Sequence, residues 1–160
     1  MDVQIRKIAW GAPKNIIAYH STKIGGWSNG AFKFSNMSLD VGDNPKDVKK
    51  NRDSMIKQLS LSNRPVFMKQ IHSATVRVAK SPSDNLVCDS CYTTVKGLPL
   101  AVLSADCLPI LISSSDGNKI GVIHAGWRGL ASGIIQKFLK RFARDPKDVV
   151  VWIGPSINPE

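Results

Sequence analysis

The sequence predicts an α/β fold built on a mixed sheet, and three observations in its second half carry this prediction. Four apolar runs have the length of buried strands: 98–105, 108–113, 120–125 and a run that ends at Gly154. Apolar residues recur at helical spacing through 130–142. Asp116-Gly117 lies between two of the runs and is a typical hairpin turn, which makes those strands antiparallel. Strands that are combined with both helices and a hairpin favour a mixed sheet over a parallel sheet in which strands and helices strictly alternate.

The N-terminal half predicts loops followed by one helix. Residues 25–32 (GGWSNGAF) and 36–45 (NMSLDVGDNP) are rich in the glycine and asparagine that mark turns. A helix is expected to begin at Asn44 or Pro45. Its apolar stripe would consist of Val48, Met55, Ile56 and Leu59.

Strand-forming residues follow this helix. Residues 66–79 (VFMKQIHSATVRVA) alternate well enough for one or two strands with a break near His72. The continuous apolar run 98–105 (LPLAVLSA) predicts a strand buried on both faces. A single helix is expected over LASGIIQKFLKRF, packed through Leu130, Ile134, Ile135, Phe138, Leu139 and Phe142.

Length and charge limit the classes of partner. The 160 residues suit one domain whose core needs no disulfide or metal. No secretory signal or membrane span is visible, so a cytoplasmic protein without a membrane partner is expected. The net charge of +10 favours anionic partners. No aromatic residues for base stacking are interleaved with the basic clusters, which argues against nucleic acid. Lys137, Lys140, Arg141 and Arg144 close a predicted helix, so a solvated face is the preferred interpretation of that cluster.

The predicted hairpin brings two reactive side chains together. If Asp116-Gly117 is a two-residue turn, His124 lies opposite Pro109, and Cys107 points to the same face two residues further on. Their Cα atoms would then be ~7–8 Å apart, close enough for both side chains to bind one metal ion. A slip of one residue would place them on opposite faces.

His72 is a third candidate ligand, because it lies at the predicted break between strands. One cysteine and two histidines would leave a fourth position open, as in catalytic zinc sites. Cys107 and His124 could equally form a metal-free nucleophile and base, or be buried residues without chemistry. The CxxC of Cys88 and Cys91 has no second pair, and we interpret it as incidental.

The residues after His124 suggest an anion site. Gly126 and Gly129 flank Trp127 and Arg128 just before the predicted helix. Glycines let backbone N–H groups approach a ligand, and a helix start favours an anion. Arg128 could hold a phosphate or carboxylate through two parallel hydrogen bonds. The alternative is a turn that merely requires glycine, with Trp127 filling the core.

Three motifs resemble those of the bacterial laccase-domain family, also named multicopper polyphenol oxidase or YfiH-like purine nucleoside phosphorylase. They are KQIH at 69–72, SADCLPIL at 104–111 and HAGWRGLASG at 124–133. GGWSNGAF and VGDNPKDVKKNRDSM match more weakly and extend the resemblance from about Thr22 to the end. The resemblance implies a four-layer α/β/β/α-like fold, related to cysteine hydrolases and to the catalytic domain of a bacterial cytotoxic necrotizing toxin.

The resemblance also implies an activity and its residues. The metal would be zinc, with copper as an alternative, held by His72, Cys107 and His124. The reactions would be phosphorolysis of adenosine, inosine and S-methyl-5′-thioadenosine, and hydrolytic deamination of adenosine, so purine nucleosides and phosphate are the expected partners. Cys107, His124 and Asp106 would be catalytic. We assign substrate binding to Asn36, Arg52, Gln70 and Arg128.

The sequence departs from the family pattern in several places. Asp40 replaces the family's histidine before VGD, CDSC at 88–91 replaces its ADA, and GAF replaces its GPY. Family members continue past the segment at which this sequence stops. We therefore expect 1–160 to be a single laccase-like domain without the family's C-terminal portion, with an exposed VVVWIG strand that favours a homo-oligomer.

Other functions remain open at this point. A metal-free Cys/His hydrolase of amides or peptidoglycan precursors would use the same cysteine and histidine. A copper-dependent polyphenol oxidase would need several coppers, which one site of two histidines and one cysteine does not supply. A non-catalytic basic binding module would show salt-sensitive binding that does not depend on Cys107.

Overall fold

The chain is described by a computed structural model that covers residues 2–143 and 145–157, and it forms two compact units. One unit contains the residues up to Ala9 together with Ile17–Ser62. The other contains Trp10–Ile16 and the described residues from Asn63 on. No helix within the described residues is long and apolar enough to cross a membrane.

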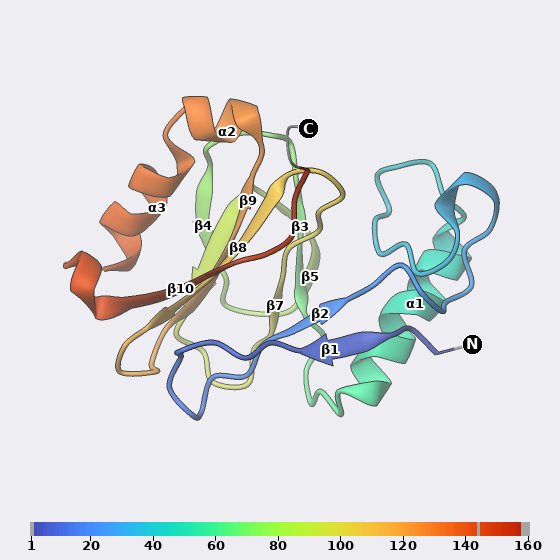
Figure 1. The fold of residues 1–160 in the computed structure, drawn as a ribbon, viewed down its shortest axis with the longest axis horizontal. Coiled ribbons are helices and arrows are strands. Elements are labelled where there is room, and N and C mark those ends of the chain that lie inside the picture. The colour runs from blue at the N-terminus through green and yellow to red at the C-terminus, as the bar shows by residue number, and fades with distance from the viewer. Residues whose placement is uncertain (1, 144, 158–160) are drawn as a thin grey trace. The chain divides into compact units, whose positions relative to one another are not determined.

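The first unit consists of a small antiparallel sheet, loops and one long helix (Figure 1). Its elements are β1 (Ile5–Lys7), β2 (Tyr19–Ser21), the 3₁₀ turn Gly30–Phe32 and α1 (Pro45–Gln58). The predicted start of the helix is confirmed, because the side chain of Asn44 accepts a hydrogen bond from the Lys46 N–H and Pro45 opens the first turn. The stripe residue Val48 is fully buried.

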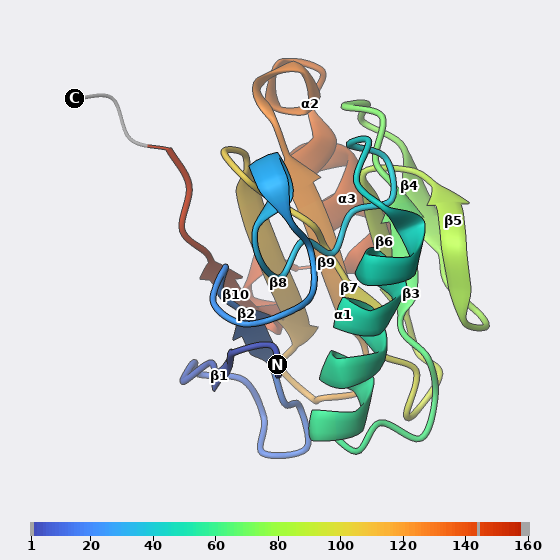
Figure 2. The same cartoon turned by 90° about the vertical axis from the view of Figure 1, so that its right-hand side faces the viewer.

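The second unit contains a five-stranded sheet and a three-stranded sheet, which confirms the mixed α/β class. The five strands lie in the order β10 (Val149–Ile153), β8 (Leu108–Ser114), β9 (Ile120–Ala125), β6 (Ser90–Thr93) and β4 (Val76–Val78), and Figure 2 shows them from left to right. All pairs are antiparallel except β4 with β6. The smaller sheet is parallel and contains β5 (Ser83–Val87), β3 (Val66–Lys69) and β7 (Leu100–Ala101).

Alternate side chains of the five-stranded sheet face two separate cores. One face packs through Ile110, Ile112 and Ile123 against the helix α3 (Ile134–Phe142). The opposite face packs through Cys91 and Val122 against residues of the three-stranded sheet. Because side chains alternate along a strand, His124 faces the same side as Val122, toward the smaller sheet.

The single helix predicted over LASGIIQKFLKRF is wrong, since the structure has two. A short helix, α2 (Trp127–Ala131), precedes α3, and the break lies at Gly133. Gly133 has φ of 77°, a left-handed conformation that ends a helix and that glycine adopts without strain. Leu130 therefore leaves the expected apolar stripe and is 38% exposed.

The strand predicted at 98–105 is mostly absent, because β7 contains only Leu100 and Ala101. These two residues are half-buried and do not form a strand covered on both faces. Beyond them, the backbone of Leu103 pairs with a side chain instead of a strand. Its N–H donates to Oε1 of Gln70, and its carbonyl accepts from Nε2 of Gln70, each at 2.8 Å.

The predicted hairpin register is confirmed. Pro109 lies opposite His124, and the N–H of Ser114 donates to the Lys119 carbonyl at the turn. Gly117 has φ of 70° in this turn, and its carbonyl accepts a hydrogen bond from Nδ2 of Asn15 at 2.9 Å. A Cβ atom on Gly117 would lie 2.4 Å from Oδ1 of Asn15.

We expect Gly117→Ala to lower the free energy of unfolding by about 2 kcal/mol or more, through left-handed backbone strain and the clash with Asn15. Gly42→Ala is the matched control. Gly42 has φ of 88°, but a Cβ there would meet nothing within 4 Å. Urea unfolding should therefore show a smaller loss, about 1 kcal/mol, for Gly42→Ala. Equal losses in the two variants would contradict the role of the Asn15 contact.

Candidate metal centre

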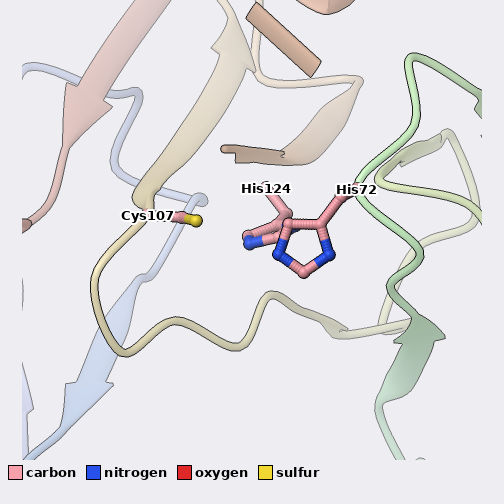
Figure 3. A group of neighbouring side chains, drawn as sticks. All are labelled: His72, Cys107 and His124. Carbon is pink, nitrogen blue, oxygen red and sulfur yellow. The ribbon is translucent and has the colours of Figure 1, made fainter. Parts of the chain in front are cut away.

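Three side chains from distant parts of the chain converge in the second unit: His72, Cys107 and His124 (Figure 3). Their ligand atoms all lie within 4.8 Å of one another. The two imidazole rings have centroids 4.9 Å apart and an interplanar angle of 78°. These residues are the three that the sequence predicts as metal ligands. The described residues contain one such group of potential ligands.

Two of the ligands lie at the ends of neighbouring strands, and the third lies in a loop. His124 is the fifth residue of β9, and Cys107 directly precedes the neighbouring strand β8. His72 lies in the loop between β3 and β4. Because Pro109 is paired with His124, Cys107 comes diagonally across from the histidine on the same face. The hairpin register alone therefore supplies two of the three ligands.

His124 is buried and held in one orientation by Asp89. Its Nδ1 lies 2.9 Å from Oδ1 of Asp89, and its backbone N–H donates to the Asp89 carbonyl at 2.7 Å. An ionised carboxylate can only accept hydrogen bonds, so Nδ1 carries the proton. The lone pair then resides on Nε2, which is the arrangement that carboxylate partners impose on metal-binding histidines.

Asp89 also organises the loop that carries His72. Its carboxylate accepts hydrogen bonds from the N–H groups of Ile71, His72 and Ser73 at 3.3, 2.9 and 2.7 Å, and from the Ser73 hydroxyl at 2.8 Å. Successive N–H groups that converge on an anion form a nest. His72 has φ of 58°, a left-handed conformation that this nest stabilises.

Burial of Asp89 works to raise its pKa, but the hydrogen bonds from His124, Ser73 and His72 outweigh burial and lower the pKa to about 2. The carboxylate is therefore ionised at neutral pH. The sequence motifs named above do not single out Asp89 as a site residue. Its position at the centre of CDSC, where the family has ADA, is the one signal that could have identified it.

Gly126 lies in crowded surroundings beside the ligands. A Cβ atom at this position would lie 3.0 Å from Sγ of Cys107 and 3.3 Å from Cδ2 of His72. A side chain here would press on both ligands, whereas glycine lets the backbone pass close to them without displacing either one. The glycine after His124 therefore belongs to the construction of the centre.

Trp127 and Arg128 follow Gly126 at the surface. Trp127 is 68% exposed, so the interpretation of this residue as core filler is wrong. The Arg128 guanidinium lies 4.4 Å from the centroid of the Trp127 ring, a cation–π contact. An exposed guanidinium fixed against an aromatic ring two residues from Gly126 is suited to hold an anion.

The other predicted site residues occupy varied environments. Asp106 is exposed, next to Cys107, and its carbonyl accepts from the Ile157 N–H at 3.1 Å. Both polar atoms of the Gln70 amide bind Leu103, so this side chain holds the segment that leads to Cys107. Asn36 and Arg52 belong to the first unit. Asn36 binds Ser38 and Asp43, and the buried Arg52 donates through Nε to the Met37 carbonyl at 2.8 Å.

Cys88 and Cys91, which flank Asp89 and Ser90, lie fully buried in the core between the two sheets. The hydrogen bond with Cys88 and burial both raise the pKa of Cys91. A buried protonated thiol is a poor nucleophile and a poor metal ligand. Both cysteines are core residues around the Asp89 turn, because both side chains are fully buried among apolar residues.

The donor set of the centre fits a transition metal. Thiolate and imidazole are the ligands that zinc and copper prefer, whereas calcium and magnesium prefer oxygen. Three protein ligands leave a fourth tetrahedral position for water or substrate, as in catalytic zinc sites. The half-buried Cys107 and the exposed His72 leave that position accessible from outside.

Comparisons with known proteins identify relatives of this chain. The chain is 38% identical to a purine nucleoside phosphorylase of Haemophilus influenzae over 151 residues, which are 94% of this chain and 62% of that protein. It is 35% identical to the purine nucleoside phosphorylase YfiH of Escherichia coli, with the same coverage. The chain thus spans about 62% of the length of these relatives.

Solved structures share the fold. A Neisseria meningitidis protein of the DUF152 family matches with a TM-score of 0.84 and 33% identity, over 96% of this chain and 63% of that one. YlmD of Geobacillus stearothermophilus matches with a TM-score of 0.76 and 33% identity, over 88% and 58% of the respective chains. The family model described as multi-copper polyphenol oxidoreductase laccase matches residues 17–160. The chain therefore belongs to the multi-copper polyphenol oxidoreductase laccase family, as its three motifs indicate.

Proposed function

We propose that this chain carries the centre of a zinc-dependent purine nucleoside phosphorylase that acts on adenosine, inosine and S-methyl-5′-thioadenosine, and that also deaminates adenosine. The observation that carries the proposal is the convergence of His72, Cys107 and His124 on one point with an open side. Relatives named purine nucleoside phosphorylase support the substrate class.

Zinc bound by these three residues would supply a Lewis acid and a water of lowered pKa at neutral pH. The chain's own residues do the positioning. Asp89 holds the proton of His124 on Nδ1 and fixes the His72 loop. Arg128, braced by Trp127, would hold the phosphate. The exposed Asp106 beside Cys107 would carry a proton to or from solvent. Asn36, Arg52 and Gln70 remain proposed contributors to substrate binding.

One observation favours a second function. Asp89, His124 and Cys107 also have the order of an acid–base–nucleophile triad, in which the acid orients the imidazole and the imidazole activates a thiol. A metal-free hydrolase of amides or peptidoglycan precursors would use these three residues and would have no need of His72. His72 therefore separates the two functions.

The test combines metal analysis with a product scan. Purified protein should contain about one zinc per chain, convert adenosine and phosphate to adenine and ribose 1-phosphate, and release inosine from adenosine in the absence of phosphate. His72→Ala should lose both metal and phosphorolysis. A metal-free protein that hydrolyses amides and is indifferent to His72→Ala would establish the triad instead. Stoichiometric copper with phenol oxidation would favour the oxidase.

A further inference from the structure

A groove lies between α3 and the edge strand β4 of the second unit. Its volume is about 620 Å³, and no ligand of the metal centre lines it. Residues 74–76 form part of its wall, and its charged lining consists of Arg77, Lys137, Lys140 and Arg141. No acidic residue contributes to the lining. Figure 1 shows α3 running alongside β4.

The four cations come from two elements that the fold brings together. Lys137, Lys140 and Arg141 are spaced by three and four residues, so they share one face of α3. Arg77 reaches the groove from β4. Nη1 of Arg141 donates to the Val76 carbonyl at 3.1 Å, which ties the helix to the strand and fixes this guanidinium in the groove.

A solvated helix end does not account for this cluster. Lys140 and Arg141 lie in the last turn of α3, where cations complement the helix dipole. Lys137 lies near the helix start, where the dipole disfavours a cation, and Arg77 is on a strand. Four like charges around one concavity repel each other, and a bound polyanion would relieve that repulsion.

We propose that this groove binds a chain of phosphates, either inorganic polyphosphate or the oligophosphate of a nucleotide. Lys137 and Arg141 are separated by about 6 Å along the helix, given a rise of 1.5 Å per residue, which is a span suited to several linked phosphates. Four cations match the charge of a triphosphate better than that of one phosphate. The groove has no aromatic lining on which a base could stack, so the phosphates, not the base, are recognised.

The probes are inorganic tripolyphosphate, ATP and AMP, titrated calorimetrically at low and at physiological salt. Tripolyphosphate and ATP should bind about equally well, and AMP should bind at least about tenfold more weakly. Raising the salt should weaken the binding of the first two. Tighter binding of ATP than of tripolyphosphate by tenfold would assign recognition to the base and overturn the proposal.

The decisive variant is Arg77→Gln/Lys137→Gln/Lys140→Gln, which leaves the Arg141 tie to Val76 intact. Lys46→Gln/Lys49→Gln/Lys96→Gln is the control, because it also removes three positive charges, but from exposed positions outside the groove. The groove variant should bind tripolyphosphate at least about tenfold more weakly, and the control should change by less than about threefold.

Equally weakened tripolyphosphate binding in both variants would show that only the net charge of +10 matters and would overturn the proposal. A lack of measurable binding by the unmodified protein would also overturn it. Should the triple variant unfold, the single exposed change Lys137→Glu provides the same comparison with Lys96→Glu. Metal content should be unchanged in every variant, so failure here is distinct from failure of the proposed phosphorylase.

Discussion

Cys107→Ala should abolish stable metal binding and adenosine phosphorolysis while the protein remains folded. The thiolate is the one anionic ligand of the centre, and it lies diagonally across the β8–β9 hairpin from His124. Two neutral imidazoles without it should bind zinc at least about 100-fold more weakly. Cys107 is only half-buried and precedes its strand, so its loss should cost little unfolding free energy, about 1 kcal/mol or less.

Cys88→Ala is the matched control for this variant. Cys88 is fully buried in the core, so its truncation should lower the free energy of unfolding by about 1–2 kcal/mol, yet leave the metal content unchanged. Cys107→Ala should therefore lose zinc, measured by mass spectrometry, and phosphorolysis while its stability to urea changes little. Cys88→Ala should lose stability to urea and keep its zinc and its phosphorolysis rate. Full zinc occupancy in Cys107→Ala would remove this residue from the ligand set.

The features predicted correctly from the sequence are the fold class, the hairpin register and the start of α1. The pairing within the hairpin follows from local rules, since the turn that contains Asp116 and Gly117 sets the pairing of Pro109 with His124 and thereby the face of Cys107. The start of α1 is likewise local, because a capping asparagine and a proline determine it. Both features depend on residues close together in the sequence.

One error occurs where a distant residue decides the backbone conformation, and others have different causes. The apolar run 98–105 has strand propensity, but the side chain of Gln70 takes both backbone groups of Leu103 and ends the pairing after Ala101. The helix break at Gly133 has a local signal that the apolar periodicity outweighed. Exposure of Trp127 could not be read from composition, because glycine-rich turns carry buried and exposed tryptophans alike.

Asp89 is the clearest case of a functional residue that tertiary structure defines. It contacts two ligand-bearing segments, residues 71–73 and His124, which precede and follow Asp89 in the sequence and are far from each other along the chain. The neighbouring cysteines form a recognisable CxxC pattern in the sequence, but the carboxylate between them is the group that positions His72 and His124. Its role follows only once the hydrogen bonds are known.

Asp89→Asn should weaken zinc binding by about 10- to 100-fold and lower the free energy of unfolding by about 2–3 kcal/mol. An amide has one acceptor oxygen where the carboxylate has two, and Asp89 is fully buried. The NH₂ group of asparagine must then replace one of the two oxygens. In place of Oδ1 it would face His124 Nδ1–H and the His72 N–H, and in place of Oδ2 it would face the N–H groups of Ile71 and Ser73, all of which are donors. At least one buried donor loses its partner, and both histidines lose their fixed orientation.

Asp116→Asn is the control, because Asp116 also has a pKa lowered to about 2, by hydrogen bonds from Ser114 and Asn118, but lies exposed in the hairpin turn. Competition with a chelator should give a wild-type zinc affinity for Asp116→Asn and a reduced one for Asp89→Asn. At saturating zinc, kcat of Asp89→Asn should recover in part, because Asp89 positions the ligands and touches no substrate. A wild-type zinc affinity in Asp89→Asn would show that the metal, and not the carboxylate, orients His72 and His124.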